Sequence, residues 1–146
     1  MTAHDFYRGE RTQNVVKCAL GIALLAAVAL LWRGVDTASF AGGLLQVLLA
    51  LALVLVVRGA FGHRHCTRIL ADLPPAPREE ARMRGIEGWW VPRQMIWASL
   101  TIVGIALGSA SGLPRWEGTG LGLVIFAAVS WIFDSFARAR CEAYMA

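Results

Sequence analysis

Charged residues are scarce in this chain of 146 residues. Asp, Glu, Lys and Arg make up 16% of it, whereas 57% of the residues are hydrophobic. A soluble globular domain has about a quarter charged residues. The shortage therefore excludes an ordinary soluble domain and predicts an integral membrane protein. The net charge of +4 does not indicate nucleic acid binding, because the basic residues lie beside apolar stretches; anionic phospholipid is the expected neighbour.

Cysteine is also rare, and Cys18, Cys66 and Cys141 show no C-x-x-C spacing. We expect reduced thiols on the cytoplasmic side of the membrane and no disulfide framework. The sequence also lacks Gly-x-Ser-x-Gly, His-Glu-x-x-His and a phosphate-binding glycine loop. We therefore expect neither enzyme activity nor a cofactor.

Long apolar stretches are present at about 15–32, 40–57, 95–113 and 121–136. Each approaches the ~20 apolar residues that an α-helix needs to cross a bilayer. Residues 33–39 form a short polar connection between the first two, and the turn LPRWEGTG, residues 113–120, joins the last two. We predict an all-α integral membrane protein with four transmembrane helices, arranged as two helical hairpins.

The predicted organisation is one membrane domain, 1–146. Its parts are a cytoplasmic lead-in 1–14, a first hairpin 15–57, a basic cytoplasmic connector 58–94, a second hairpin 95–137 and a cytoplasmic tail 138–146. Within the connector, a helical extension of the second span is expected from Arg58 to Leu73. Pro74 and Pro75 should end it, because proline cannot continue the hydrogen-bond pattern of a helix.

Lys and Arg gather in the lead-in, the connector and the tail, whereas the two short turns hold only Arg33 and Arg115. The positive-inside bias predicts that both termini and the connector are cytoplasmic, and the composition suggests a bacterial inner membrane. The sequence GIAL at 21–24 recurs at 104–107. This favours a parallel tandem repeat of the two hairpins, with chance similarity between apolar segments as the alternative.

Small residues recur at four-residue spacing in two of the predicted helices, which places each set on one helix face. Such faces pack closely against a neighbouring helix or another subunit. The residues predicted to pack in this way are Ala19, Ala23, Ala27, Gly104, Gly108 and Gly112. For the alanines, the alternative is that alanine is simply abundant in this chain.

Polar side chains inside the predicted spans are few. Asp134 lies near the end of the last one, at nearly the same depth as Arg58, and we predict a structural ion pair between them. Arg138, four residues on, is an alternative partner, and a proton or cation site is an alternative role. Gln46 is predicted to hydrogen-bond a neighbouring helix, with a place on a transport path as the alternative.

The motif His63-x-His65-Cys66 contains residue types that bind metals. On a helix, His63 and His65 point about 200° apart and cannot share one ion. His65 and Cys66, with Cys141 from the other half, therefore remain candidate metal ligands. The alternative is that the histidines are solvated side chains in a basic collar.

An aromatic and basic rim is predicted on the cytoplasmic side. Tryptophan suits the boundary between headgroups and acyl chains, and arginine suits anionic lipids or a protein partner. The residues assigned to membrane interface or partner docking are Trp89, Trp90, Arg82, Arg84 and Arg93.

Together these features predict an accessory or assembly subunit of a larger bacterial inner-membrane complex. It would pack through its small-residue faces against other membrane subunits or copies of itself. The alternative is a small oligomeric channel or transporter with Asp134 and Gln46 near its path. Because polar residues are so scarce inside the spans, the first hypothesis is favoured.

Overall fold

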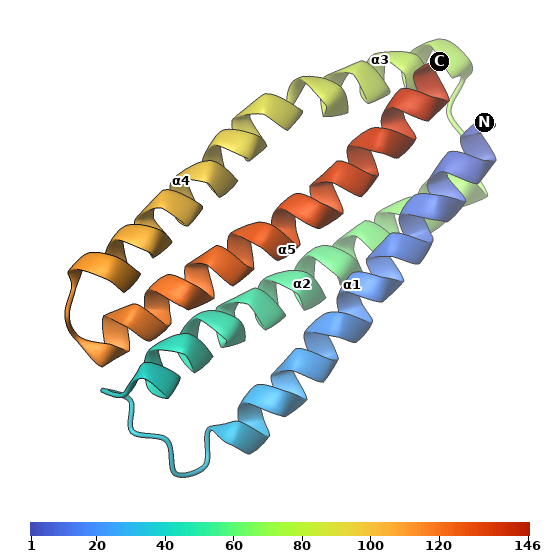
Figure 1. The fold of residues 1–146 in the computed structure, drawn as a ribbon. Coiled ribbons are helices and arrows are strands. Elements are labelled where there is room, and N and C mark those ends of the chain that lie inside the picture. Colours follow the sequence, from blue (N-terminus) through green and yellow to red (C-terminus); the bar gives the residue numbers. More distant parts are fainter.

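The computed structural model describes all 146 residues and is entirely helical, without strands (Figure 1). In chain order its helices are α1 (Ala3–Leu31), α2 (Phe40–Ala71), α3 (Ala76–Gly88), α4 (Trp90–Ala110) and α5 (Pro114–Met145). Four helical segments are long and apolar enough to cross a membrane: α1, α2, α5 and Ala76–Ala110, which joins α3 to the more apolar α4. The prediction of an all-α chain with four segments able to span a membrane is confirmed at this level.

Local signals set the ends of the first two long helices. α1 begins at a capping box, in which the Asp5 N–H donates to Thr2 Oγ1 (3.2 Å) and the Thr2 N–H donates to the Asp5 carboxylate (3.3 Å). The helix therefore starts within the polar lead-in, well before the apolar stretch. α2 continues past Val57 to Ala71, so the expected helical extension is observed, and Pro74 and Pro75 follow it.

The second short connection differs from the prediction. The sequence suggested a turn over 113–120, but α5 already begins at Pro114, so only 111–113 separate it from α4. Proline is favourable in the first helical turn, where its missing N–H would have no partner anyway. Gly112 lies in this connection with φ of +63°. The prediction that Gly112 packs on a helix face with Gly104 and Gly108 is therefore wrong.

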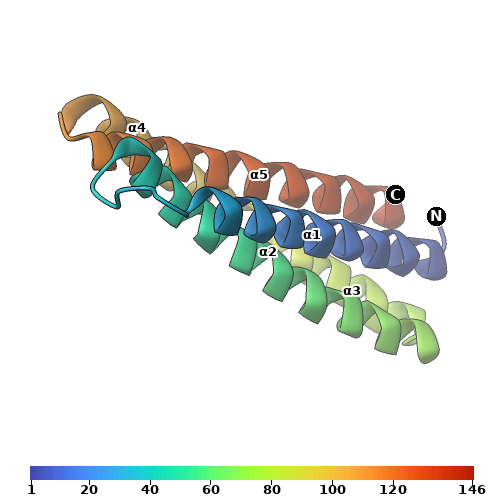
Figure 2. The ribbon, with the colours of Figure 1, turned by 90° about the horizontal axis from the view of Figure 1, so that it is seen from below.

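The four long helices lie side by side in the order α1, α2, α5, α4 (Figure 1). α1 packs along α2, α2 along α5 and α5 along α4, while α1 and α4 do not contact each other. Both chain termini lie at one end of this layer together with α3 (Figures 1 and 2). We call it the termini end, and the opposite end, with the two short connections, the turn end. α1 and α4 are thus edge helices, each with one principal neighbour.

Glycines lie at all three interfaces of the layer. A Cβ added at Gly21 of α1 would stand 2.8 Å from the backbone oxygen of Ala52 in α2. One added at Gly118 of α5 would overlap the Phe40 carbonyl oxygen of α2, and one at Gly104 of α4 would stand 2.6 Å from a carbonyl oxygen of α5. Backbones that approach this closely leave no room for side chains. The layer is therefore held by close backbone packing, as expected for helices in lipid.

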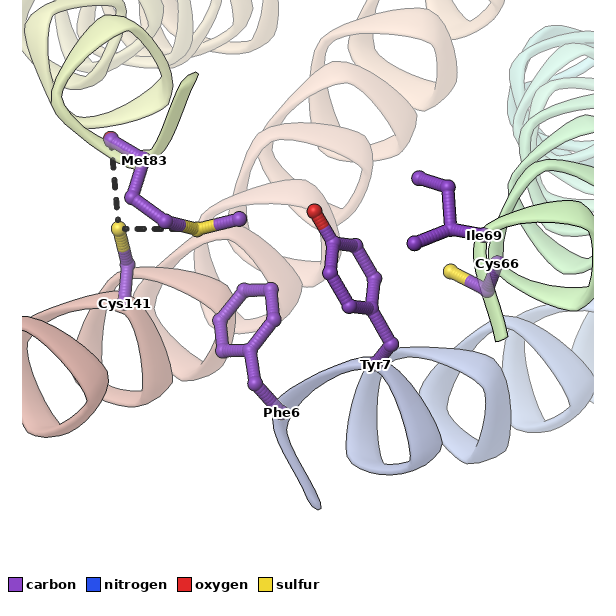
Figure 3. Close-up of a cluster of buried hydrophobic side chains, with 6 residues drawn as sticks. All are labelled: Phe6, Tyr7, Cys66, Ile69, Met83 and Cys141. Atoms are coloured by element: carbon purple, nitrogen blue, oxygen red, sulfur yellow. Dashed lines mark hydrogen bonds between the residues drawn. The ribbon is translucent and has the colours of Figure 1, made fainter. Parts of the chain in front are cut away.

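A small hydrophobic cluster closes the termini end (Figure 3). It joins α1, α2, α3 and α5, and the side chains of Phe6 and Tyr7 meet edge to face, with ring centroids 5.2 Å apart. The cluster consists of Phe6, Tyr7, Cys66, Ile69, Met83 and Cys141. It brings α3 against the long helices, where Arg82 of α3 meets His65 of α2 and the Tyr7 ring of α1.

Candidate functional site

Near the termini end, Asp134 of α5 contacts polar side chains of two neighbouring helices, and only 4% of the residue is exposed. Its Oδ1 lies 3.3 Å from Arg58 Nη2 of α2 and 3.8 Å from Arg93 Nη1 of α4, and its Oδ2 accepts a hydrogen bond of 2.8 Å from Trp97 Nε1. The carboxylate thus links α5 to both of its long neighbours. Arg138, the alternative partner considered from the sequence, pairs with Glu142 instead.

The sequence did not point to Trp97 or Arg93 as partners of Asp134. Trp97 lies inside an apolar stretch, where an indole usually serves only packing, and Arg93 was assigned to the membrane interface. The signal that was available is spacing: Arg93 and Trp97 are four residues apart and share one face of α4. That face points at α5 in the structure.

A cavity of about 360 Å³ lies beside Asp134 at the termini end. All five helices contribute side chains to its lining. The charged residues among them are four cations and two carboxylates: Lys17, Arg58, Arg82, Arg93, Glu10 and Asp134. The cavity is therefore positively charged, and it is formed by residues that are far apart in the sequence.

Lys17 points into the molecule. The ammonium of a lysine near the end of a span commonly reaches outward to the headgroups, but Lys17 is only 9% exposed and donates to Asn14 Oδ1 at 3.3 Å. Its Nζ also lies 5.5 Å from the centroid of the Phe133 ring. The inward direction has a simple cause: Lys17 and Gly21 are four residues apart on one face, and that face packs toward α2.

The candidate metal ligands do not form a metal site. No group of three His, Cys, Asp or Glu side chains is arranged to hold an ion. Cys66 and Cys141 belong to the hydrophobic cluster, and the Cys141 thiol donates to the Met83 carbonyl oxygen at 3.5 Å. Burial raises the pKa of both thiols, which disfavours the thiolate that a metal requires.

His65 belongs to the part of α2 beyond its apolar stretch, and its Nε2 is hydrogen-bonded to Arg82 of α3. Partial burial, and then the charges of Arg82 and Arg68, lower the pKa of His65. A neutral imidazole can accept from the guanidinium, so this contact ties α3 to α2 without a carboxylate.

The residues assigned to the interface divide into two groups. Arg82 and Arg93 line the cavity, whereas Arg84 is exposed and Trp89 is 67% exposed. Trp90 is half-buried beneath Arg138, whose guanidinium carbon lies 4.9 Å from the centroid of one indole ring. Only Trp89 and Arg84 therefore present free side chains to a membrane or a partner.

The two predicted small-residue faces, on α4 and on α1, lie in different surroundings. Gly104 and Gly108 of α4 pack against Gly120 of α5, as a Cβ added to Gly120 would stand 2.4–2.7 Å from their backbone atoms. The stripe formed by Ala19, Ala23 and Ala27, by contrast, is exposed on the surface of the chain. Its packing against another subunit stays a prediction.

Gln46 lies near the turn end, where its Oε1 accepts a hydrogen bond of 3.3 Å from Arg115 Nη2 of α5. It is about 18 Å along α2 from Arg58, at 1.5 Å per residue. Gln46 and Asp134 therefore belong to opposite ends of the layer, and each already has a partner on a neighbouring helix.

We expect Gln46→Leu to change the free energy of unfolding by less than about 1 kcal/mol. The bond to Arg115 is exposed, so the guanidinium can turn to water or headgroups when the amide is removed. Unfolding of the purified chain in mixed detergent micelles measures this. A loss of several kcal/mol would mean that Gln46 holds α2 to α5.

Comparison of the chain with models of protein families, with curated proteins and with solved structures finds no match.

Proposed function

We propose that this chain is an accessory or assembly subunit of a larger membrane complex, which packs laterally against other subunits or copies of itself through its edge helices. The observation that carries the proposal is the alanine stripe of α1. Ala19, Ala23 and Ala27 follow one another at four-residue spacing, and all three are exposed. A smooth face of this kind allows another helix to approach closely.

The position of the stripe on α1 supports this role. At 100° per residue, Ala23 lies about 160° around the helix from Gly21, which contacts α2. α1 therefore turns Gly21 toward its own chain and the alanine stripe away from it. The first makes an interface in this chain, and we propose that the second makes one with a partner.

The open layer also supports a partner on the edges. In the most apolar 18-residue window of each segment, buried residues make up 17% in α1 and 6% in Ala76–Ala110, against 33% in α2 and 28% in α5. The two edge helices thus leave most of their apolar surface uncovered by this chain. A larger assembly would cover these faces with protein.

The proposal includes a topology. Both termini and the basic connector would lie in the cytoplasm of a bacterial cell, and the two hairpins, 15–57 and 95–137, would share one orientation as a parallel repeat in the inner membrane. The support is the distribution of Lys and Arg, which are concentrated at the termini end. Trp89 and Arg84, exposed at that end, would then face headgroups or a cytoplasmic partner.

A channel or transporter has less support from the geometry. Its path was expected to include Asp134 and Gln46, but these lie at opposite ends of the layer, and each is bonded to an arginine. Polar side chains that could connect the two residues are scarce inside the spans.

The test is the size of the native assembly. We expect the full-length chain, purified in mild detergent, to run on native gels as an assembly well above 15.8 kDa plus its micelle, with constant stoichiometry by mass spectrometry. Ala23→Leu should reduce the assembled fraction at least about tenfold, since a bulky side chain separates the helices. Ile22→Leu, at an exposed position about 100° away, is the matched control and should leave it unchanged.

Two results would contradict the proposal. One is a chain that runs as a single copy, and the other is an assembly that tolerates Ala23→Leu as well as Ile22→Leu.

A further inference from the structure

The charges that line the cavity beside Asp134 do not balance. Arg58 and Arg93 share the single carboxylate of Asp134. The other carboxylate, Glu10, accepts two hydrogen bonds, of 2.7 and 2.9 Å, from Arg140, which is not part of the lining. Both carboxylates are therefore occupied.

Two cations of the lining are left without a carboxylate: Lys17 and Arg82 have none within 4 Å. Lys17 is nearly buried, and its polar contact within the chain is with Asn14. Removing an ammonium from water without an opposite charge is costly, and the Phe133 ring compensates only in part. An anion in the cavity would supply the missing charge.

Arg82 also retains donor capacity. Its guanidinium bonds the neutral His65 ring and lies 5.9 Å from the centroid of the Tyr7 ring, so only part of its five N–H donors is used. Tyr7 itself is 3% exposed, and its hydroxyl has no hydrogen-bond partner in the chain. In Figure 3 this hydroxyl points away from α1, between Met83 and Ile69. Met83 and Ile69 do not line the cavity, so the Tyr7 ring forms part of the cavity wall while its hydroxyl faces the hydrophobic cluster.

A second hollow, of about 490 Å³, adjoins the first and shares Phe61, Gly62 and His65 with it. Its other lining residues are Arg64 and Arg68, and no carboxylate lines it. The positive surface therefore continues from the cavity along the polar end of α2. Its extent suits an anion that is larger than a single halide ion.

We propose that this cavity binds a phosphate group, held by Lys17 and Arg82. Phosphate offers several acceptor oxygens, and a guanidinium matches their geometry with paired hydrogen bonds. At ~30 Å³ for each water molecule, 360 Å³ is room for about a dozen waters and hence for a phosphate with a small headgroup.

The phosphate can come from two sources, an anionic phospholipid or a soluble phosphate compound. Phe61 and Ile86, which line the cavity, are 69% and 40% exposed. They would offer apolar surface to the glycerol and acyl chains of a lipid beside the bound headgroup. A soluble phosphate would use the same cations without that surface.

The test uses the full-length chain in two arms. In the first arm, the protein is placed in phosphatidylcholine nanodiscs that contain increasing amounts of phosphatidylglycerol. Native mass spectrometry of the protein released from them counts the phosphatidylglycerol molecules that stay bound. In the second, inorganic phosphate is titrated into protein in neutral detergent and followed by ³¹P NMR. Arg82→Gln is compared with Arg84→Gln, which removes the same charge from an exposed position on the same helix.

We expect saturable binding at one site and an affinity at least about tenfold lower in Arg82→Gln, with less than about a twofold change in Arg84→Gln. Lys17→Gln should weaken binding similarly, and it serves as the second variant if Arg82→Gln does not fold. Saturation by the lipid assigns the headgroup as the source, whereas saturation by inorganic phosphate alone assigns a soluble compound. Absence of saturable binding in both arms, or equal loss in Arg82→Gln and Arg84→Gln, would overturn the proposal. The proposal does not depend on the lateral packing of α1.

Discussion

Replacing Asp134 by leucine should lower the free energy of unfolding by about 2–4 kcal/mol. The change leaves the Trp97 N–H without its acceptor and places two arginines beside each other without a counter-charge. The side chains of Arg58 and Arg93 are 38% and 43% exposed, so part of their charge is solvated and the loss stays below that of a fully buried pair. Asp134→Asn should cost less, because its amide oxygen still accepts from Trp97.

The measurement is unfolding in mixed micelles by titration with a denaturing detergent. Glu142→Gln is the matched control, since it removes a carboxylate from an exposed pair with Arg138 on the same helix. Pairs of this kind contribute at most about 1 kcal/mol. If Asp134→Leu were no more destabilising than Glu142→Gln, Asp134 would not hold α2 and α4 to α5.

The second large effect is expected from adding one methyl group at Gly118. A Cβ there would overlap the carbonyl oxygen of Phe40, and backbone cannot move aside as the tip of a side chain can. Gly118→Ala should therefore push α5 away from α2 and cost about 3 kcal/mol. Gly43→Ala, on the opposite side of the same contact, should behave alike, because its Cβ would overlap the carbonyl oxygen of Arg115.

Gly85→Ala provides the control with the opposite sign. Gly85 lies inside α3, and nothing lies within 4 Å of the position of an added Cβ. Alanine is favoured over glycine in a helix, so this change should stabilise the chain by up to about 1 kcal/mol. The same unfolding experiment serves for all three variants. Equal effects of Gly118→Ala and Gly85→Ala would show that α2 and α5 are not in close contact.

Much of the fold could be predicted from local features of the sequence. Long apolar stretches are helical in a membrane because every backbone polar group must be bonded within its own segment. Pro74 and Pro75 end the extension of α2 because of their own covalent structure. Asp134 and Arg58 are both polar exceptions beside apolar spans, so the sequence predicts their pairing, and the structure places the two side chains 3.3 Å apart.

The sequence by itself determined which segments are helical, where most of them end and how few polar groups they contain. Only the tertiary structure decided which way each helix turns about its axis. That rotation directs Lys17 inward, brings Arg82 and Arg93 to one cavity and leaves the alanine stripe of α1 exposed. It is set by contacts between glycines and backbone atoms of other helices. Because such contacts join positions far apart in the chain, no local pattern specifies them.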